Sequence, residues 1–367
     1  MRKYYANVSA IVCKLYFCNH ISQSKMKKKR NITLKDIAKE LNLSVSTVSR
    51  ALNNHPDISE ITKVQVQALA KQYNYVPNLF AKGFRTKHTH IIGVVVPNIS
   101  HFFTTTILKG ILEQGEKMGY QVIVAESQND VNKQLAMLNT MIQFGVDGIL
   151  LSMARRTYDV SSIIKIKQRV PLVLFDKVSN KVPCTQVVID EVDAAYGAVE
   201  HLINIGKKRI AIIKETENSY NSEMRFRGYQ KALEDHNLEV DPKLIVSTED
   251  ISLDKGRIMA SALLTLRNKP DAIFAITDAA AIGAIKALKK YNVKIPEDIA
   301  VIGFSNSEHA TIISPALTTV DQPGNLIGST AITYLINEIE KEEESFLKTV
   351  EVKTHLIIRD STFTTVK

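Results

Sequence analysis

The sequence has few cysteines, no long apolar run and none of the common catalytic motifs. Three cysteines in 367 residues are too few and too scattered for a disulfide framework or a tetrahedral metal site. No apolar run approaches the roughly 18 residues that a membrane-spanning helix needs, so a membrane role is not expected. Phosphate-binding loops, G-x-S-x-G and H-E-x-x-H are absent, so we expect no cofactor and no metal.

Charged residues make up only 23% of the chain and hydrophobic residues 45%, which is a globular composition and excludes a disordered or collagen-like chain. At roughly 150 residues per domain, the length predicts two or three compact units. Residues 1–90 hold 16 of the 47 Lys and Arg but only 4 of the 38 Asp and Glu. This asymmetry predicts a module that faces nucleic acid, joined to a nearly neutral body.

The first residues imitate a secretion signal only weakly. Lys14 interrupts the apolar stretch 4–18, and no small-residue cleavage site follows it. Met26 stands directly before the basic run 27–30. We therefore expect residues 1–25 to be an N-terminal extension upstream of the true start, poorly ordered, on a protein that is cytoplasmic and reduced.

Three short helices are predicted after this extension. Thr33, with Asp36 three residues later, forms a capping box for the first helix. Ser44 can cap a second helix over 45–52, and Ser59 a third. Two such amphipathic helices are more often part of an ordinary all-α core than a DNA reader. The basic charge around them favours a helix-turn-helix.

The exposed surface at the start of the second helix carries side chains that would not be natural choices for a hydrophobic core. In a helix-turn-helix these positions face base edges, while neighbouring cations meet phosphates. Two roles fit Arg50, a bidentate contact to guanine worth about 1–3 kcal/mol in discrimination or a phosphate contact. The residues of this surface are Val45, Ser46, Thr47, Ser49 and Arg50.

Residues 32–53, with 75–78 and Ala81, closely resemble the headpiece of the LacI/GalR family of bacterial transcriptional regulators. The resemblance extends from about Thr33 to Asp360. Its further motifs are Ile92-Gly93-Val94, Arg225-x-x-Gly228, Asp278-x-x-Ala281-x-Gly283 and residues 317–323.

The resemblance implies a helix-turn-helix headpiece at 26–76 and a hinge helix and linker at 77–89. About eight residues are too few for a stable isolated helix, which needs roughly 12–15, so the hinge should order only when paired on DNA. Phe84 stands where the family usually has Leu, and its ring can wedge into the minor groove or pack against the body. The implied DNA contacts, with Val45, Ser46 and Arg50 reading bases, are Thr33, Val45, Ser46, Thr47, Ser49, Arg50, Asn53, Tyr75, Asn78, Ala81 and Phe84.

From residue 90 short apolar runs alternate with amphipathic stretches, which predicts parallel sheets covered on both faces. The number of strands favours two α/β halves, and the resemblance implies a periplasmic-binding-protein-like effector and dimerisation domain at 90–367. We place the chain crossings near Asp190, near 317–323 and after Glu342. The expected subdomains are 90–189 with 321–342, and 190–320 with 343–367.

Ligands of open α/β sheets bind at the carboxyl ends of strands, and the residues there suit a small polar ligand. Core packing is the alternative role for Met153 and Phe175. For Arg225 the alternative is pairing with a carboxylate across the cleft, and for Asp278 it is capping of its own helix. The implied effector contacts are Phe102, Ser127, Met153, Phe175, Asp176, Arg225 and Asp278, with Ser305 where many members have Asp or Asn.

The resemblance implies a repressor that binds a palindromic operator as a homodimer under the control of a small-molecule effector. A carbohydrate is the first expectation for the effector and a purine the second, and a protein corepressor is a variant. Residues 357–367 contain no leucine heptad, so we expect no tetramer. A solute-binding receptor needs an export signal and no basic headpiece, and an enzyme needs a catalytic constellation that the sequence does not display.

Overall fold

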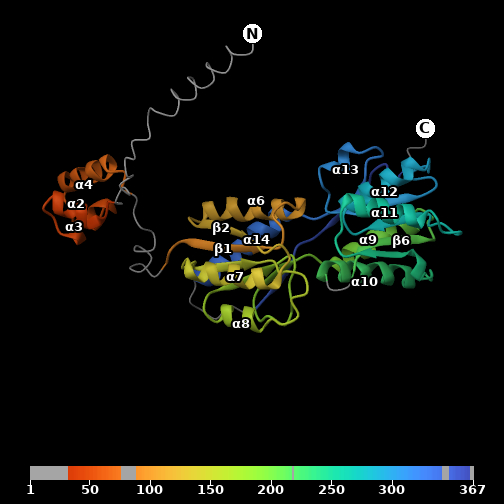
Figure 1. Ribbon diagram of the computed structural model, residues 1–367, viewed down its shortest axis with the longest axis horizontal. Coiled ribbons are helices and arrows are strands. Elements are labelled where there is room, and N and C mark those ends of the chain that lie inside the picture. The colour runs from red at the N-terminus through yellow and green to blue at the C-terminus, as the bar shows by residue number, and fades with distance from the viewer. Residues whose placement is uncertain (1–31, 76–87, 217–218, 341–346, 364–367) are drawn as a thin grey trace, which may run out of the picture. The chain divides into compact units, whose positions relative to one another are not determined.

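The computed structural model describes residues 32–75, 88–216, 219–340 and 347–363. The chain divides into two compact units, Met1–Lys82 and Gly83–Lys367 (Figure 1). The N-terminal extension 1–25, the basic run 27–30 and the hinge positions 79–85 lie outside the described residues.

Over its described residues, 32–75, the first unit holds three helices, α2 (Leu34–Glu40), α3 (Val45–Leu52) and α4 (Glu60–Gln72). The predicted capping box is present, because the Thr33 hydroxyl accepts from the Asp36 amide and the Asp36 carboxylate accepts from the Thr33 amide. Ser44 and Ser59 cap the next two helices as predicted. The three helices enclose one small core, whose buried members are Ile37, Ala38, Val48, Ala51, Val66 and Ala70.

In the second unit the described residues form two α/β lobes, each built on one six-stranded sheet. In the first lobe the strand order is β11-β5-β4-β3-β1-β2, and the contacts between these strands are parallel. The strands are β1 (Ile91–Val96), β2 (Gln121–Glu126), β3 (Gly148–Leu151), β4 (Leu172–Phe175), β5 (Gln186–Val188) and β11 (Thr349–Glu351).

Helices cover both faces of this sheet, which is why its central strands read as continuous apolar runs. α6 (Phe102–Lys117) and α14 (Gly324–Glu340) pack together on one face, and α7 (Val131–Gln143) and α8 (Ser161–Lys167) lie on the other (Figure 1). The α6–α14 contact is close, because a Cβ on Gly328 would lie 2.0 Å from the Ile107 carbonyl oxygen.

The sheet of the second lobe has the order β12-β10-β9-β8-β6-β7, with β12 antiparallel to β10. Its strands are β6 (Ile210–Glu215), β7 (Ile245–Thr248), β8 (Ala272–Ala275), β9 (Ala300–Phe304), β10 (Thr318–Asp321) and β12 (His355–Ile357). α9 (Glu191–Asn204) and α10 (Tyr220–Asp235) cover one face, and α11 (Leu253–Leu263) and α12 (Asp278–Lys290) the other; the short α13 (His309–Ile312) and η1 (Pro242–Leu244) complete the lobe.

One predicted subdomain boundary is wrong. We placed the last crossing after Glu342, with residues 343–367 in the second subdomain. The structure pairs β11 with β5 of the first lobe and β12 with β10 of the second, so the chain crosses between Glu351 and His355. Strand β11 has only three residues, and so short an edge strand gives almost no periodic signal in the sequence.

The predicted fold class, a helical headpiece followed by two α/β subdomains with essentially parallel sheets, is confirmed. None of the described helices is both long and apolar enough to span a bilayer. Both lobes direct the carboxyl ends of their parallel strands into loops, where ligands of such sheets are bound.

Candidate functional site

Helix α3 presents a polar face opposite its core face. Val48 and Ala51 are buried, whereas Val45, Ser46 and Arg50 are exposed. At 100° per residue, positions 45, 46, 49, 50 and 53 fall within one arc of the helix, so the structure brings their side chains to one surface. Ser46 and Arg50 are exposed on that surface, away from the headpiece core, so they are accessible for recognition.

The remaining predicted DNA contacts have structural partners of their own. Asn53 donates from Nδ2 to the Ser49 carbonyl at 2.7 Å at the end of α3. The hydroxyls of Thr47 and Ser44 lie 2.8 Å apart at its start. Tyr75 is half-buried against the headpiece core, where burial raises the pKa of its phenol. Thr33 serves the capping box, and Asn78, Ala81 and Phe84 lie outside the described residues.

A polar cavity of about 320 Å³ lies between the two lobes, and we call it the polar chamber. Its walls come from the carboxyl ends of strands in both lobes and from the loops that follow them. The lining includes three cationic residues, Arg155, Lys177 and Arg225, and three acidic ones, Asp176, Glu215 and Asp250, so its formal charges balance.

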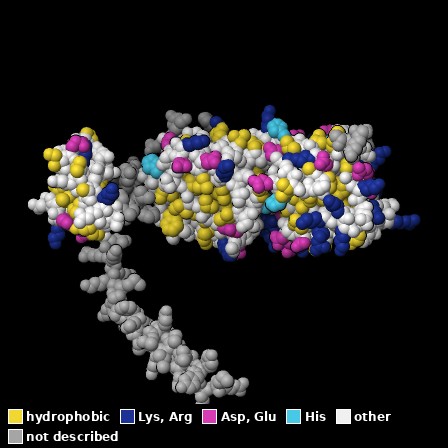
Figure 2. Space-filling view, turned by 90° about the horizontal axis from the view of Figure 1, so that it is seen from above, with side chains coloured by type: hydrophobic (Ala, Val, Ile, Leu, Met, Phe, Trp, Pro, Cys, Tyr) yellow, Lys and Arg dark blue, Asp and Glu magenta, His cyan; other side chains and the backbone are white. Residues whose placement is uncertain are grey.

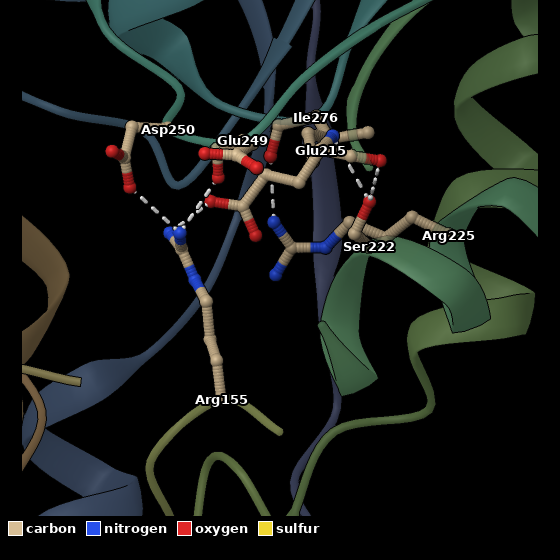
Figure 3. A network of polar contacts seen from close by, with 7 residues as sticks. All are labelled: Arg155, Glu215, Ser222, Arg225, Glu249, Asp250 and Ile276. Carbon is tan, nitrogen blue, oxygen red and sulfur yellow. Dashed lines mark hydrogen bonds and ion pairs between the residues drawn. The ribbon is translucent and has the colours of Figure 1, made fainter. Parts of the chain in front are cut away.

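Direct contacts across the polar chamber join the lobes. Arg155 of the first lobe donates to the Glu249 carbonyl at 2.8 Å and to Asp250 Oδ1 at 2.9 Å, and it also pairs with the buried carboxylate of Glu215 (Figure 3). In the other direction, Asn221 Nδ2 of the second lobe donates to Asp176 Oδ1 of the first at 2.8 Å. Because most of the residues that make these contacts also line the chamber, a ligand that displaced them would remove bonds that hold the two lobes together.

Unpartnered polar atoms gather around this chamber. Among the described residues, six buried side-chain polar atoms have no hydrogen-bond partner, and five of the six belong to residues that line the chamber. They are Asn129 Oδ1, Arg155 Nε, Asn221 Oδ1 and both polar atoms of the Gln322 amide. Buried polar groups are normally satisfied, so this concentration indicates a place for a hydrogen-bonding ligand or for water.

The backbone around the polar chamber is also strained. Non-glycine residues adopt left-handed conformations at the ends of three strands: φ is 58° at Asn129 and at Asp176, and 114° at Ser305. Such conformations cost about 1–3 kcal/mol each, and they persist where the surrounding structure holds them. All three of these residues line the chamber.

Arg225 lines the polar chamber but is also firmly paired. Its Nε donates to Glu191 Oε2 at 2.7 Å and its Nη2 to Glu191 Oε1 at 3.1 Å, while Nη1 donates to the Ile276 carbonyl at 2.6 Å. The guanidinium stacks 3.6 Å from the centre of the Phe304 ring. Burial raises the pKa of Glu191, and the guanidinium beside it opposes that shift. The carboxylate partner belongs to the same lobe, whereas the sequence suggested a partner across the cleft.

Asp278 does not line the polar chamber and does not cap its helix, because Thr277 is the N-cap of α12. Its carboxylate accepts from the Thr319 hydroxyl of β10 at 2.6 Å and from the Ser307 amide at 2.5 Å, so it joins α12 to β10 and to the loop after β9. Burial raises the pKa of Asp278, although these hydrogen bonds oppose the shift. In this structure Asp278 is therefore a positioning residue for the loop after β9.

The structure separates the other predicted effector contacts into two groups. Asp176, Arg225 and Ser305 line the polar chamber. Phe175 is a core residue, and the buried Ser127 hydroxyl is 3.3 Å from the Val96 carbonyl. Phe102 is the first residue of α6 and does not line the chamber, whereas its neighbour Phe103 does. Met153 packs in the core and lines an adjoining cavity.

Several chamber residues were not predicted. Arg155, Lys177 and Glu215 follow or end strands that the sequence did indicate, so extending each strand by a few residues would have found them. Asp250 follows β7, a half-buried strand that the apolar pattern did not reveal. The group missed comprises Asn129, Arg155, Lys177, Glu215, Asp250 and Gln322.

His101 lines the mouth of the polar chamber. The residue retains exposed surface, yet its ring packs among enough neighbouring atoms that desolvation, followed by the charge of Lys177, lowers its pKa. A neutral imidazole is therefore expected there at neutral pH. Within the described residues no cluster of His, Cys, Asp and Glu has the geometry of a metal site.

Comparison with known proteins gives matches over both units. Residues 33–78 match the family "Bacterial regulatory proteins, lacI family", and residues 199–362 match "Periplasmic binding protein-like domain". The NTD biosynthesis operon regulator NtdR of Bacillus subtilis (strain 168) is 34% identical over 90% of this chain and 99% of its own length.

Solved structures agree in fold. The Lac repressor dimer bound to operator and the anti-inducer ONPF superposes with a TM-score of 0.81 over 91% of this chain and 100% of that one, at 24% identity. The complex of the transcriptional regulator CelR with cellobiose matches with a TM-score of 0.69 over 90% of this chain and 99% of that one, at 26% identity.

Proposed function

The chain belongs to the LacI family of bacterial regulatory proteins, and we propose that it is a cytoplasmic repressor that binds a palindromic operator as a homodimer. Its affinity for the operator is set by an uncharged polyhydroxylated ligand, a sugar, held in the polar chamber. It acts as a regulator and catalyses no reaction.

The observation that supports DNA binding is the exposed face of α3. Val45, Ser46 and Arg50 are exposed on one side of a helix whose opposite side builds the headpiece core. An arginine on the outer face of a recognition helix can contact guanine in the major groove. The excess of basic residues in the first 90 positions supplies the attraction for phosphates.

The chemistry of the polar chamber favours a neutral ligand with several hydroxyls. Its cationic and acidic residues balance, and both arginines already have carboxylate partners, so among the described residues only Lys177 remains to pair with a phosphate or carboxylate ligand. The unpartnered atoms include both donors and acceptors, on Arg155, Asn221 and Gln322. Hydroxyl groups can serve both kinds at once. The cellobiose found in the complex of a related regulator is consistent with such a ligand.

A purine is the less suitable alternative. Planar bases bind between apolar or aromatic faces, and the face of Phe304 is already occupied by the Arg225 guanidinium at 3.6 Å. Phe103 lines the chamber but is only 6% exposed. Within the described part of the chamber, hydrogen-bonding groups therefore outweigh accessible rings.

The surface of the first lobe supports a dimer. Apolar side chains gather on the face of this lobe that carries α6 (Figure 2). Leu112 of α6 is 46% exposed and Leu326 of the adjacent α14 is 53% exposed. Strand β2 lies at the edge of the sheet, and most of its residues are only partly buried. Such an edge and patch suit pairing with a second copy.

Operator binding by the purified full-length protein tests this proposal. After selection of a preferred duplex from a random pool, affinity should be far higher for an inverted repeat than for a single half-site. A dimer that contacts about 6–10 phosphates should lose roughly 10³- to 10⁵-fold in affinity between 50 and 200 mM salt. A flat salt response, or the absence of any preferred duplex, would contradict the proposal.

Paired variants separate base reading from general charge. Arg50→Ala should weaken operator binding by about 1–3 kcal/mol and relax the preference at one base position. Lys71→Ala removes a similar charge from the exposed end of α4 and serves as the control. Equal losses of affinity on random and selected DNA for Arg50→Ala would indicate a phosphate contact instead.

A further inference from the structure

A second cavity, of about 260 Å³, adjoins the polar chamber. Arg155, Lys177 and Ser219 line both cavities, so the two spaces adjoin at these residues. Its character is different, because much of its wall is apolar or aromatic. We call it the aromatic annex, and its apolar and aromatic walls are Met153, Ala154, Tyr158, Val178, Tyr220 and Met224.

Two tyrosines line the annex and keep much of their surface free. Tyr158 is 63% exposed and Tyr220 is 38% exposed. Neither ring makes an aromatic or cation–π contact among the described residues. Large aromatic side chains that remain open on a cavity wall are suited to stacking against a ligand.

The loop that carries Tyr158 is a tight, ordered turn. Arg156 adopts a left-handed conformation with φ of 59°, the Tyr158 amide donates to the Arg156 carbonyl at 2.9 Å, and the Thr157 hydroxyl donates to the Ala154 carbonyl at 2.7 Å. A left-handed conformation costs a non-glycine residue about 1–3 kcal/mol and persists only where the surrounding structure holds it. The turn fixes the position of Tyr158 beside the annex.

Arg155 stands between the two spaces. Its guanidinium reaches across to Glu215, Asp250 and the Glu249 carbonyl of the second lobe, as Figure 3 shows. The same side chain lines the annex. A ligand that occupies both spaces would therefore pass along Arg155, whose Nε has no partner.

We propose that the aromatic annex is a second ligand subsite, which binds the second ring of a disaccharide whose first ring lies in the polar chamber. A pyranose ring presents a face of C–H groups to an aromatic ring and hydroxyls at its edge. The annex offers both complements, with the tyrosine rings on its walls and Lys177, Ser179 and Glu223 at its polar rim. This inference rests on the proposal that the polar chamber binds a sugar.

Calorimetric titration of the full-length protein tests the subsite. The probes are glucose, galactose, mannose and fructose, compared with maltose, cellobiose, lactose and sucrose. One disaccharide should bind on the order of tenfold more tightly than either of its component sugars, as two aromatic contacts would provide. Tyr158→Ala removes one of these two contacts, so it should reduce the gain to about threefold and leave the affinity for the monosaccharide within about twofold.

Further variants make the result specific. Tyr158→Phe keeps the ring and should retain the gain, and Tyr291→Ala removes an exposed tyrosine that lines neither space and should change nothing. If a monosaccharide binds but no disaccharide binds more tightly, or if Tyr158→Ala weakens both equally, the subsite is refuted while the sugar effector stands. If none of the eight sugars binds, the sugar assignment fails and the subsite with it.

Discussion

The pair formed by Arg225 and Glu191 offers a direct test of how the second lobe is stabilised. Their side chains are 6% and 5% exposed and are joined by two hydrogen bonds. Arg225→Met keeps much of the apolar bulk that stacks on Phe304 but removes the charge. Glu191 would then be buried without its cation, and the Ile276 carbonyl would lose its donor.

Removal of one partner from a buried ion pair typically costs about 3–5 kcal/mol. For a unit of this size that corresponds to a fall in Tm of roughly 5–8 °C. In the variant the pKa of Glu191 would be raised further, since burial would act without the opposing guanidinium. The folded variant would then bind a proton more readily than the unfolded chain, so the stability lost relative to wild type should shrink as pH falls from 8 toward 5.

Urea unfolding of the full-length protein at several pH values measures both effects. The double variant Arg225→Met with Glu191→Leu should recover all but about 1 kcal/mol, because an apolar pair can replace a buried ion pair while the Ile276 carbonyl still lacks its donor. A loss below 1 kcal/mol for the single variant, or a double variant that is no more stable than the single one, would refute the reasoning.

Three further predictions concern the headpiece, the first lobe and the chamber. Ser44→Ala removes the N-cap of α3 and should lower headpiece stability by about 0.5–2 kcal/mol, measured by thermal unfolding; an unchanged midpoint would contradict a structural role for this cap. Gly328→Ala should destabilise the protein by about 1–3 kcal/mol, because its Cβ would lie 2.0 Å from the Ile107 oxygen. Gly197→Ala meets nothing within 4 Å and should be neutral or slightly stabilising, so equal effects of the two substitutions in chemical denaturation would disprove the packing argument. Because the pKa of His101 is lowered in the folded protein, the unfolded chain binds a proton at this histidine first as pH falls below 6.5, and the stability of the folded protein should decrease. The Tm of His101→Gln should therefore fall less than that of wild type between pH 7 and pH 5.

Local patterns in the sequence predict the headpiece and most of the strands. The caps at Thr33, Ser44 and Ser59 act on amides within three residues, so they are visible in the sequence itself. The apolar runs at β1, β3 and β4 are continuous because helices cover both faces of the sheet. The charge asymmetry and the polar face of α3 are likewise local properties, so a DNA-facing module can be predicted without tertiary structure.

The ligand cleft depends on contacts between segments far apart in the chain. Whether Asp278 faces a ligand or binds Thr319 is decided by how α12 meets β10, 41 residues away. Likewise Arg155 meets Asp250 across 95 residues of chain and across two lobes. The crossing between β11 and β12 is set by which sheet edge remains open.

The amino-acid sequence by itself determined the order of the elements, their caps and the position of the basic module, because these follow from interactions over a few residues. Only the tertiary structure decided which polar side chains line the cleft and which are held in ion pairs, as Arg225 is with Glu191. The physical reason is that a buried charge or amide takes whichever partner the folded chain brings within hydrogen-bonding distance, and that partner is not encoded locally.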